Sequence, residues 1–361
     1  MKKLRIALVC GGFSKENVIS VQSAATIAQH LSPELFETYK IVIDPDRWYY
    51  APEAENGAAA GNAQDAKAGN AAPAAAQPQT YDIDKNDFSL NLPSGKVTFD
   101  AALIAIHGDP GENGRLQGYF DMLHLPYTTC NACTSALTFN KAYCNAVLAH
   151  NGIRVAPSLH LFREECAEPA RKEAAARQIA EKIGFPCFIK PNAGGSSIGM
   201  SKVTEAAQLP AALDKAFAED CEILAEAFVK GDEYSCGLMR HDGQLQVFPL
   251  TQIVPDTEFF DYEAKYLGKS KEITPAPAAP ALVAQIGEIA KRVYRILHCA
   301  GVVRCDFIVE EKTGDIYFLE VNTTPGQSAQ SIVPQQVQHM GWALDKFYET
   351  LIHESLCSQA L

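Results

Sequence analysis

The segment VVRCDFIVEEKTGDIYFLEVNTTPG, residues 302–326, decides how the last part of the chain folds. Apolar and polar residues alternate on both sides of EKTGD, and Gly314 lies in that turn, so the pattern predicts an antiparallel hairpin. One predicted face carries Cys305, Phe307, Val309, Tyr317, Leu319 and Val321; the other carries Arg304, Asp306, Ile308, Ile316, Phe318, Glu320 and Asn322. The second face therefore gathers most of the hairpin's polar side chains.

The register of this hairpin predicts a site of concentrated negative charge. A five-residue loop, residues 311–315, places Asp306 opposite Glu320 and Arg304 opposite Asn322. Directly opposed carboxylates repel each other on a sheet, so a positive charge should lie between them. A divalent cation bound by Asp306, Glu320 and Asn322 is one hypothesis, because hard cations prefer carboxylate and amide oxygens. Neutralisation by Arg304 alone, or a different register, is the alternative.

Length and composition narrow the class of protein. A chain of 361 residues is long enough for two or three domains, and 47% hydrophobic residues with a mean hydropathy of -0.09 fit a globular protein. The net charge of -12 argues against a nucleic-acid partner held by phosphate contacts. We find no membrane span or signal peptide, and eleven scattered cysteines suit a reducing compartment. We therefore expect a cytoplasmic protein that binds neither nucleic acid nor membrane.

The order of apolar segments predicts three domains. Residues 1–135 read as a parallel α/β domain, because RIALVC, YKIVIDP and DAALIAIHG are strand-like and VQSAATIAQHL is helical. Residues 51–79 contain no Val, Ile, Leu or aromatic residue, so we expect a disordered alanine-rich surface insertion. Residues 136–233 form a predicted α+β central unit. Residues 234–361 complete the chain with further strands, a helix and the hairpin.

A glycine-rich loop in the central unit suggests an anion site. In IKPNAGGSSIGMSKV, residues 189–203, backbone N–H groups and the hydroxyls of Ser196 and Ser197 can converge on a phosphate beside Lys190. A plain surface hairpin is one alternative. A serine hydrolase is another, because Gly195 to Gly199 match G-x-S-x-G; however, the residues that follow alternate like a strand rather than forming a helix.

Other charged residues extend the candidate site. Lys141 and Lys265, with the glycine loop and the carboxylates, are the parts that nucleoside triphosphate chemistry needs. Glu226 and Glu233 flank a turn at Gly231 and otherwise read as surface carboxylates. Glu16, in GGFSKENVIS after the first strand, can hold an ammonium group or simply favour a helix N-terminus. His107 ends a predicted strand, where parallel sheets bind ligands.

Taken together, these segments resemble a D-alanine–D-alanine ligase of the ATP-grasp superfamily over nearly the whole chain except residues 51–79. The motifs that carry the resemblance are GGFSKENVIS, IHGDPGENGRLQG, FIKPNAGGSSIGMSKV, FFDYEAKY, VVRCDF and LEVNTTPG, in this order. The resemblance implies an α/β ATP-grasp fold preceded by a parallel α/β N-terminal domain. It also implies D-alanine and ATP as substrates and a homodimer, the common state of the family.

The resemblance further implies roles for individual residues in ATP binding. Lys141 and Lys190 would contact the phosphates beside Ser197, Glu226 the adenine amino group, the backbone of Ala227 and Val229 the adenine ring, and Glu233 the ribose. Asp306, Glu320 and Asn322 would bind two Mg²⁺ ions, or Mn²⁺ in their place.

For the substrates, the resemblance implies a reaction in two steps. ATP would phosphorylate the carboxylate of the first D-alanine, and the amine of the second would displace phosphate. Glu16, aided by His107, would bind the ammonium group of the first D-alanine, and Ser331 would hold the carboxylate of the second. Arg304 and Gly326 would stabilise the oxyanion. Lys265 would close over the phosphate, and Ser196 would link Glu16 to Tyr266.

The sequence leaves open two alternative ligase activities and one alternative function without catalysis. A ligase that joins D-alanine to D-serine or D-lactate has the same fold, although Tyr266 goes with D-alanine in the family. A nucleotide-binding module without catalysis is the different class, and the Arg304, Asp306, Glu320 and Asn322 set argues against it. The chain departs from the family at Val18, Asn113 and Gln327, which affects substrate binding more than ATP binding.

Overall fold

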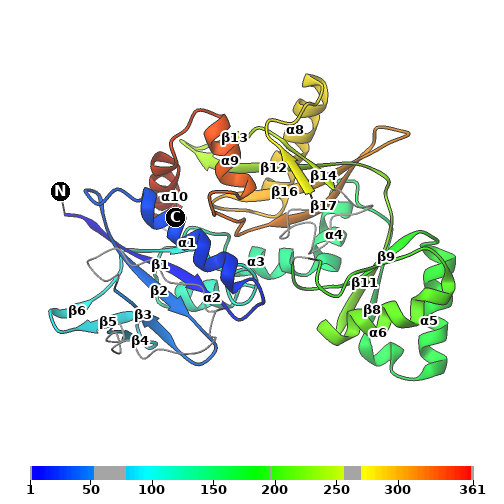
Figure 1. Ribbon diagram of the computed structural model, residues 1–361, viewed down its shortest axis with the longest axis horizontal. Helices are drawn as coiled ribbons and strands as arrows, with labels where there is room; N and C mark the ends of the chain where they lie inside the picture. Colours follow the sequence, from blue (N-terminus) through cyan, green and yellow to red (C-terminus); the bar gives the residue numbers. More distant parts are fainter. Residues whose placement is uncertain (1, 53–78, 196, 256–269, 359–361) are drawn as a thin grey trace, which may run out of the picture.

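The computed structural model describes residues 2–52, 79–195, 197–255 and 270–358. The three sheets that these residues form follow one another along the longest axis of the molecule (Figure 1). The predicted disorder of residues 51–79 concerns mainly residues 53–78, which lie outside the described part. Among the described residues, no helix combines the length and the apolar character that crossing a membrane requires.

The N-terminal sheet has seven strands in the order β6-β5-β4-β3-β2-β1-β7. Strand β1 (Leu4–Gly11) runs parallel to β2 (Phe36–Ile43) and β7 (Ala101–Ile104), as predicted. The remaining strands pair antiparallel: β3 (Trp48–Tyr50), β4 (Tyr81–Asp84), β5 (Ser89–Leu92) and β6 (Gly95–Val97). Helices α1 (Asn17–His30) and α2 (Arg115–Met122) belong to this domain. The insertion joins β3 to β4, which pair with each other.

The central unit is a four-stranded sheet in the order β10-β9-β11-β8, and every pair is antiparallel. Its strands are β8 (Ser158–Phe162), β9 (Cys187–Pro191), β10 (Ser201–Val203) and β11 (Glu222–Ala227). Helices α5 (Pro169–Lys182) and α6 (Leu209–Glu219) supply the apolar residues that pack on this sheet. Helices α3 (Ala132–Phe139) and α4 (Lys141–His150) lead into it from the N-terminal domain (Figure 1).

The C-terminal sheet has six strands, with β15-β14-β12-β16-β17 in order and β13 paired to β12. The strands are β12 (Gly231–His241), β13 (Gln244–Val247), β14 (Thr251–Pro255), β15 (Ser270–Ile273), β16 (Val303–Glu310) and β17 (Ile316–Asn322). Helix α8 (Pro280–Ile296) packs its apolar face on this sheet. Helices α9 (Ile332–His339) and α10 (Leu344–Ser358) follow the hairpin.

The β16–β17 hairpin has the predicted register at its functional end. Asp306 pairs with Glu320, and Arg304 pairs with Asn322. Between Asp306 and Phe307, however, the register shifts by one, so that Phe307 pairs with Phe318 and Val309 with Ile316. The predicted faces of residues 316–319 are therefore wrong.

This β-bulge decides which side chains face the cavity described below. Phe318 is buried against Phe307 in the core, whereas Tyr317 and Leu319 turn toward the cavity together with Glu320. A bulge places one extra residue on its strand and bends it. The consequence is a strand that buries Phe318 and still presents Leu319 and Glu320 side by side.

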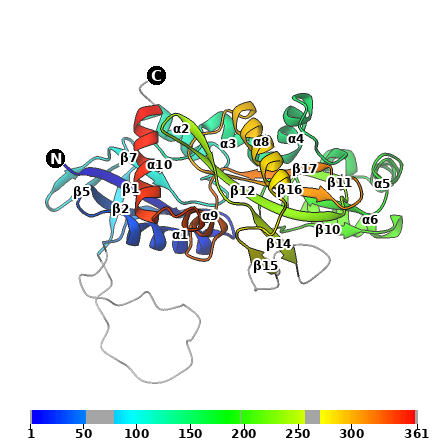
Figure 2. The same cartoon turned by 90° about the horizontal axis from the view of Figure 1, so that it is seen from above.

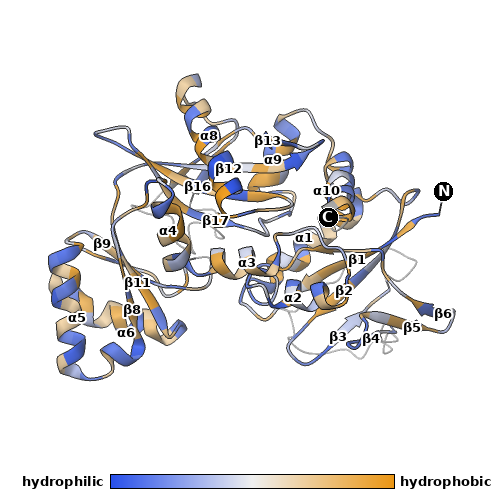
Figure 3. Ribbon diagram, turned by 180° about the vertical axis from the view of Figure 1, so that it is seen from behind, coloured by the Kyte–Doolittle hydropathy of each residue, from blue (hydrophilic) through white to orange (hydrophobic). Residues whose placement is uncertain are grey.

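The last helices cover the N-terminal sheet. Helix α10 packs against α1, α9, β7 and β12, and Figure 2 shows it standing beside β1 and β2. One core cluster accordingly joins Ile6 and Leu8 of β1 to Phe347, Tyr348 and Leu351 of α10. Figure 3 shows apolar residues along the strands of the larger sheets, with polar residues on parts of α5 and α10. The core of the first domain is thus completed from the end of the described chain.

Candidate active site

A cavity of about 860 Å³ opens between the central and C-terminal sheets, with part of its wall from the loop after β1. Its size suits a ligand as large as a nucleotide together with a small substrate. The predicted residues that line it are Glu16, Lys141, Lys190, Ser197, Glu226, Ala227, Val229, Glu233, Arg304, Asp306 and Glu320. Ser196, Lys265 and Tyr266 lie outside the described residues. Asn322, Gly326 and Ser331 lie next to the wall, as shown below.

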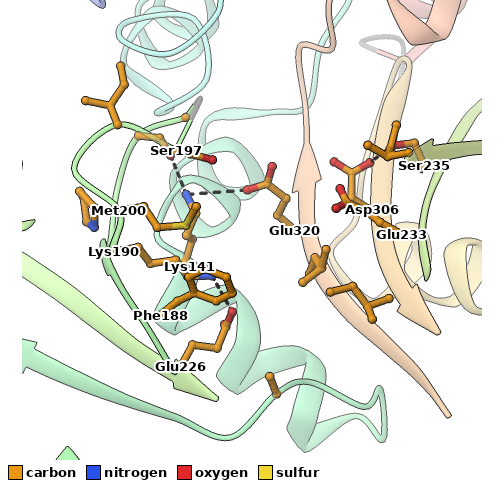
Figure 4. A pocket seen from close by; sticks show the side chains of 18 of the residues that line it. Lys141, Phe188, Lys190, Ser197, Met200, Glu226, Glu233, Ser235, Asp306 and Glu320 are labelled. Carbon is orange, nitrogen blue, oxygen red and sulfur yellow. Dashed lines mark hydrogen bonds and ion pairs between the residues drawn. The ribbon is translucent and has the colours of Figure 1, made fainter. Parts of the chain in front are cut away.

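Two lysines lie on the central side of the cavity (Figure 4). Lys190 on β9 forms an ion pair with Glu226 on the neighbouring strand β11, with 2.7 Å between Nζ and Oε1. The side chain of Glu226 is only 6% exposed, so this pair is largely removed from water. Asn145 Nδ2 lies 3.5 Å from the other Glu226 oxygen. The pair sets Lys190 and Glu226 in fixed positions along one wall.

Lys141 is positioned by the start of helix α4. Its backbone N–H donates to the carbonyl of Asn192, and the Asn192 side chain accepts from the next residue, Ala142. The Lys141 Nζ donates to the Gly194 carbonyl at 2.6 Å and lies 3.9 Å from Glu320 Oε2. Burial lowers the pKa of Lys141, while Glu320 opposes that shift. Lys141 therefore places its side-chain nitrogen between the glycine loop and the hairpin.

Asp306 is the most heavily bonded carboxylate on the hairpin side. Arg304 donates to both its oxygens, from Nε at 2.9 and 3.2 Å and from Nη2 at 2.8 Å. Ser235 Oγ donates to Oδ1 at 2.6 Å, and Asn322 Nδ2 donates to Oδ2 at 3.0 Å. Burial lowers the pKa of Arg304, but Asp306 and Glu320 outweigh burial and raise it above the ordinary value. Both residues of the pair are buried.

Side chains of the kind that bind a hard divalent cation meet on this hairpin. Asp306 and Glu320 face each other across β16 and β17, and Asn322 adds an amide beside Asp306. Carboxylate and amide oxygens are the donors that Mg²⁺ prefers. Across residues 2–52, 79–195, 197–255 and 270–358, no group of three or more His, Cys, Asp or Glu side chains is arranged to hold a metal ion. A metal at the hairpin would therefore need Asn322 as well as the two carboxylates, with the Asn322 amide turned so that its oxygen, and not the Nδ2 that now donates to Asp306, faces the ion.

Gly326 and Ser331 lie together just after β17. A methyl group added at Gly326 would come within 2.7 Å of Ser331 Oγ, so glycine permits this close approach. Ser331 precedes α9, and its hydroxyl lies 2.7 Å from Ser328 Oγ. The next residue, Ile332, lines the cavity. These two predicted substrate contacts therefore border the same end of the cavity.

Glu16 reaches the cavity from the N-terminal domain and meets the glycine loop. A methyl group built at Gly195 would lie 3.0 Å from a Glu16 carboxylate oxygen. His107 is buried, with Nε2 3.1 Å from Ser23 Oγ and Nδ1 2.7 Å from the carbonyl of Thr324. The structure thus brings Glu16 to the cavity, while the His107 ring joins α1 to the loop after β17.

Sequence reasoning assigned no role to Glu112, which links the N-terminal domain to the same loop. Its Oε2 accepts from the Gly108 N–H at 2.8 Å, and its Oε1 accepts from the Thr324 N–H at 3.0 Å. Burial, and then the charge of Glu16, raise the pKa of Glu112 to about 7. The GENG motif contains Glu112, but nothing local indicates a contact with a residue so distant in the chain.

The serine hydrolase alternative fails on geometry. The G-x-S-x-G segment connects β9 to β10, which pair antiparallel, so it is a hairpin loop. A nucleophile elbow must instead lead from a strand into a helix. Ser197 does line the cavity, where its φ is 55°. The loop between β9 and β10 therefore lacks the strand-to-helix geometry of a nucleophile elbow.

Family models and known proteins are similar to this chain in sequence. A family model described as D-ala D-ala ligase N-terminus matches residues 5–130, and one described as D-ala D-ala ligase C-terminus matches residues 147–353. A D-alanine--D-alanine ligase of Flavobacterium johnsoniae is 40% identical over 97% of this chain and 99% of its own length. One of Phocaeicola vulgatus is 42% identical over 94% and 95%.

Solved structures of ligases are similar to this protein in fold. The VanG D-Ala:D-Ser ligase from Enterococcus faecalis matches with a TM-score of 0.81 at 28% identity, covering 98% of this chain and all of that one. D-alanyl-alanine synthetase A from Vibrio cholerae matches with a TM-score of 0.81 at 26% identity, covering 99% of each. These matches confirm the ATP-grasp fold preceded by an α/β domain. The chain therefore belongs to the D-alanine–D-alanine ligase family.

Proposed function

We propose that this protein is an ATP-dependent ligase that joins two D-alanines through an acyl phosphate. The product, D-alanyl-D-alanine, would serve peptidoglycan synthesis in the cytoplasm, and the enzyme would act as a homodimer. The observation that carries the proposal is the meeting of three groups at one cavity: the cations Lys141 and Lys190, the opposed carboxylates Asp306 and Glu320, and Glu16.

ATP would lie between the central and C-terminal sheets. Glu226 would accept from the adenine amino group, the backbone of Ala227 and Val229 would contact the ring, and Glu233 would hold the ribose. Lys141, Lys190 and Ser197 would bind the phosphates, which is supported by the position of both ammonium groups on the cavity wall. Asp306, Glu320 and Asn322 would hold two Mg²⁺ ions, or Mn²⁺. The bound ions supply charge neutralisation for the phosphates.

The remaining residues would orient the two amino acids. Glu16 would bind the ammonium of the first D-alanine, so that the carboxylate of this D-alanine faces the γ-phosphate of ATP. Arg304 and the Gly326 N–H would stabilise the oxyanion that forms when the second amine attacks. Ser331, adjacent to Gly326, would hold the carboxylate of the second D-alanine. Lys265 would close over the transferred phosphate, and Ser196 would link Glu16 to Tyr266.

The chemistry explains why ATP is needed. A free carboxylate is a poor electrophile, and phosphorylation gives it a leaving group. The acyl phosphate must also be shielded from water, which a closed cavity achieves. A ligase with D-serine or D-lactate as second substrate would use the same first step and differ only at the second subsite.

The proposal is tested by measuring phosphate release from Mg·ATP with D-alanine, with L-alanine and without an amino acid, and by identifying the product. We expect release that requires D-alanine and collapses in Glu320→Gln, with D-alanyl-D-alanine as the product. Faster product formation from D-alanine with D-serine or D-lactate would assign a different second substrate. Bound ATP without phosphate release under any condition would refute an active ligase.

A further inference from the structure

The loop after β17, residues 323–328, is held by three side chains from the N-terminal domain. Glu112 accepts from the Thr324 N–H at 3.0 Å, and the His107 Nδ1 lies 2.7 Å from the Thr324 carbonyl. Ser23 Oγ on α1 accepts from the Gln327 N–H at 3.1 Å. Thr324 and Gln327 bracket Gly326, so the backbone is fixed on both sides of that residue.

Two of these contacts form one directed chain of hydrogen bonds. The Thr324 carbonyl can only accept, so the His107 Nδ1 carries the proton in this bond. Ser23 Oγ accepts from Gln327 and lies 3.1 Å from His107 Nε2, to which its own hydroxyl can donate. The hydrogen bonds therefore run in one direction, from the Gln327 N–H through Ser23 and His107 to the Thr324 carbonyl. Together with the backbone from Thr324 to Gln327 they close a ring, which encloses Pro325 and Gly326.

The ring is buried and is supported from the other side. Ser23 is 0% exposed and His107 6%, so water does not compete readily for these bonds. The Gln327 side chain donates to the Pro325 carbonyl at 3.1 Å and accepts from the Tyr348 hydroxyl of α10 at 3.3 Å. The amide of Gln327 therefore adds contacts within the loop and to α10.

We propose that Ser23 is a positioning residue for the ligation step: its hydroxyl fixes the backbone that carries the Gly326 N–H. This inference rests on the proposed function, in which Gly326 stabilises the oxyanion. An oxyanion donor contributes only when it is held at hydrogen-bond distance from the developing charge, and losing one typically costs about 10²–10³ in rate. Ser23 would act through the loop without touching either amino acid.

Ser20 provides a matched control one turn earlier on the same helix. It is also 0% exposed, and it also makes two hydrogen bonds: Oγ accepts from the Gly11 N–H at 3.0 Å and donates to the Ala105 carbonyl at 2.7 Å. These partners belong to the N-terminal sheet region and not to the loop after β17. Ser20→Ala therefore removes an equivalent buried hydroxyl and leaves the ring intact.

The test compares Ser23→Ala with Ser20→Ala in the full-length protein. We expect Ser23→Ala to lower kcat for dipeptide formation about tenfold or more, with KM for ATP changed less than about twofold. Hydrogen–deuterium exchange of peptides covering residues 323–328 should accelerate in Ser23→Ala alone. Ser20→Ala should keep kcat within about threefold of the wild type.

Equal kcat losses in the two variants, or unchanged exchange of the loop in Ser23→Ala, would overturn the positioning role. Failure of the proposed function is a separate result, because the wild type itself would then form no dipeptide. Even in that case the exchange experiment decides whether Ser23 fixes the loop.

Discussion

Replacing Asp306 by asparagine should destabilise the protein as well as inactivate it. Asp306 is 4% exposed and accepts hydrogen bonds from Arg304, Ser235 and Asn322. An asparagine has the same shape but no negative charge. Its NH2 group would also face one or more of the donors that now bond to Asp306, and two donors cannot form a hydrogen bond with each other. The guanidinium of Arg304, itself 8% exposed, would lose its main counter-charge.

The expected magnitude follows from this burial. Removing one partner of a buried ion pair costs about 3–5 kcal/mol, because the remaining charge is left without compensation. Glu320→Gln is the matched comparison on the opposite strand. The Glu320 side chain is 37% exposed and its ion pair with Lys141 spans 3.9 Å, so its loss should cost less than about 1 kcal/mol.

Urea unfolding of both variants, without Mg²⁺ or nucleotide, measures these free energies apart from any bound ion. We expect both variants to lose ligation, and Asp306→Asn alone to lose several kcal/mol of unfolding free energy. A loss below about 1 kcal/mol in Asp306→Asn, or equal losses in the two, would refute the interpretation of Asp306 as the anchor of a buried charge pair.

Three further predictions concern other contacts of the site. Glu226→Gln should weaken ATP binding about tenfold or more in calorimetry, because it removes the negative charge that pairs with Lys190 at 2.7 Å and replaces one of the two acceptor oxygens with an amide donor. Glu112 has its pKa raised from 4.5 to about 7, so the folded protein holds this proton more tightly than the unfolded chain. The unfolding free energy of the wild type relative to Glu112→Gln should therefore fall by roughly 2–3 kcal/mol between pH 4.5 and 7 and then level off; a constant difference would contradict the shift. Thr324→Val should leave the melting temperature unchanged or raise it, because the Thr324 hydroxyl is buried without a partner among the described residues; a drop of several degrees would show that the hydroxyl is used.

The functional end of the hairpin could be predicted because its alternation is strict there. Arg304, Asp306, Glu320 and Asn322 interleave with apolar residues, so only one register buries the apolar face. Nearer the turn, residues 316–319 read IYFL and do not alternate. Either face can then be buried, and the bulge is decided by the fit of Phe318 into the core.

Contacts between distant segments were beyond sequence reasoning for a different reason. His107 and Thr324 are 217 residues apart, and nothing local to either indicates the other. The cations and carboxylates of the cavity were predicted because motif order and family resemblance supplied what periodicity alone does not. The antiparallel strands β3 to β6 were missed, because they are only three or four residues long.

The packing of α10 on the N-terminal sheet has a consequence for how the protein is made. The residues of α10 are synthesised more than 300 residues after β1, yet Phe347, Tyr348 and Leu351 share a core with Ile6 and Leu8. On the ribosome, this face of the first sheet can pack against α1 at once, but the part that α10 covers stays exposed while the central and C-terminal sheets emerge. We expect nascent chains to be more prone to aggregation during that interval, when a chaperone that shields apolar surface would protect them.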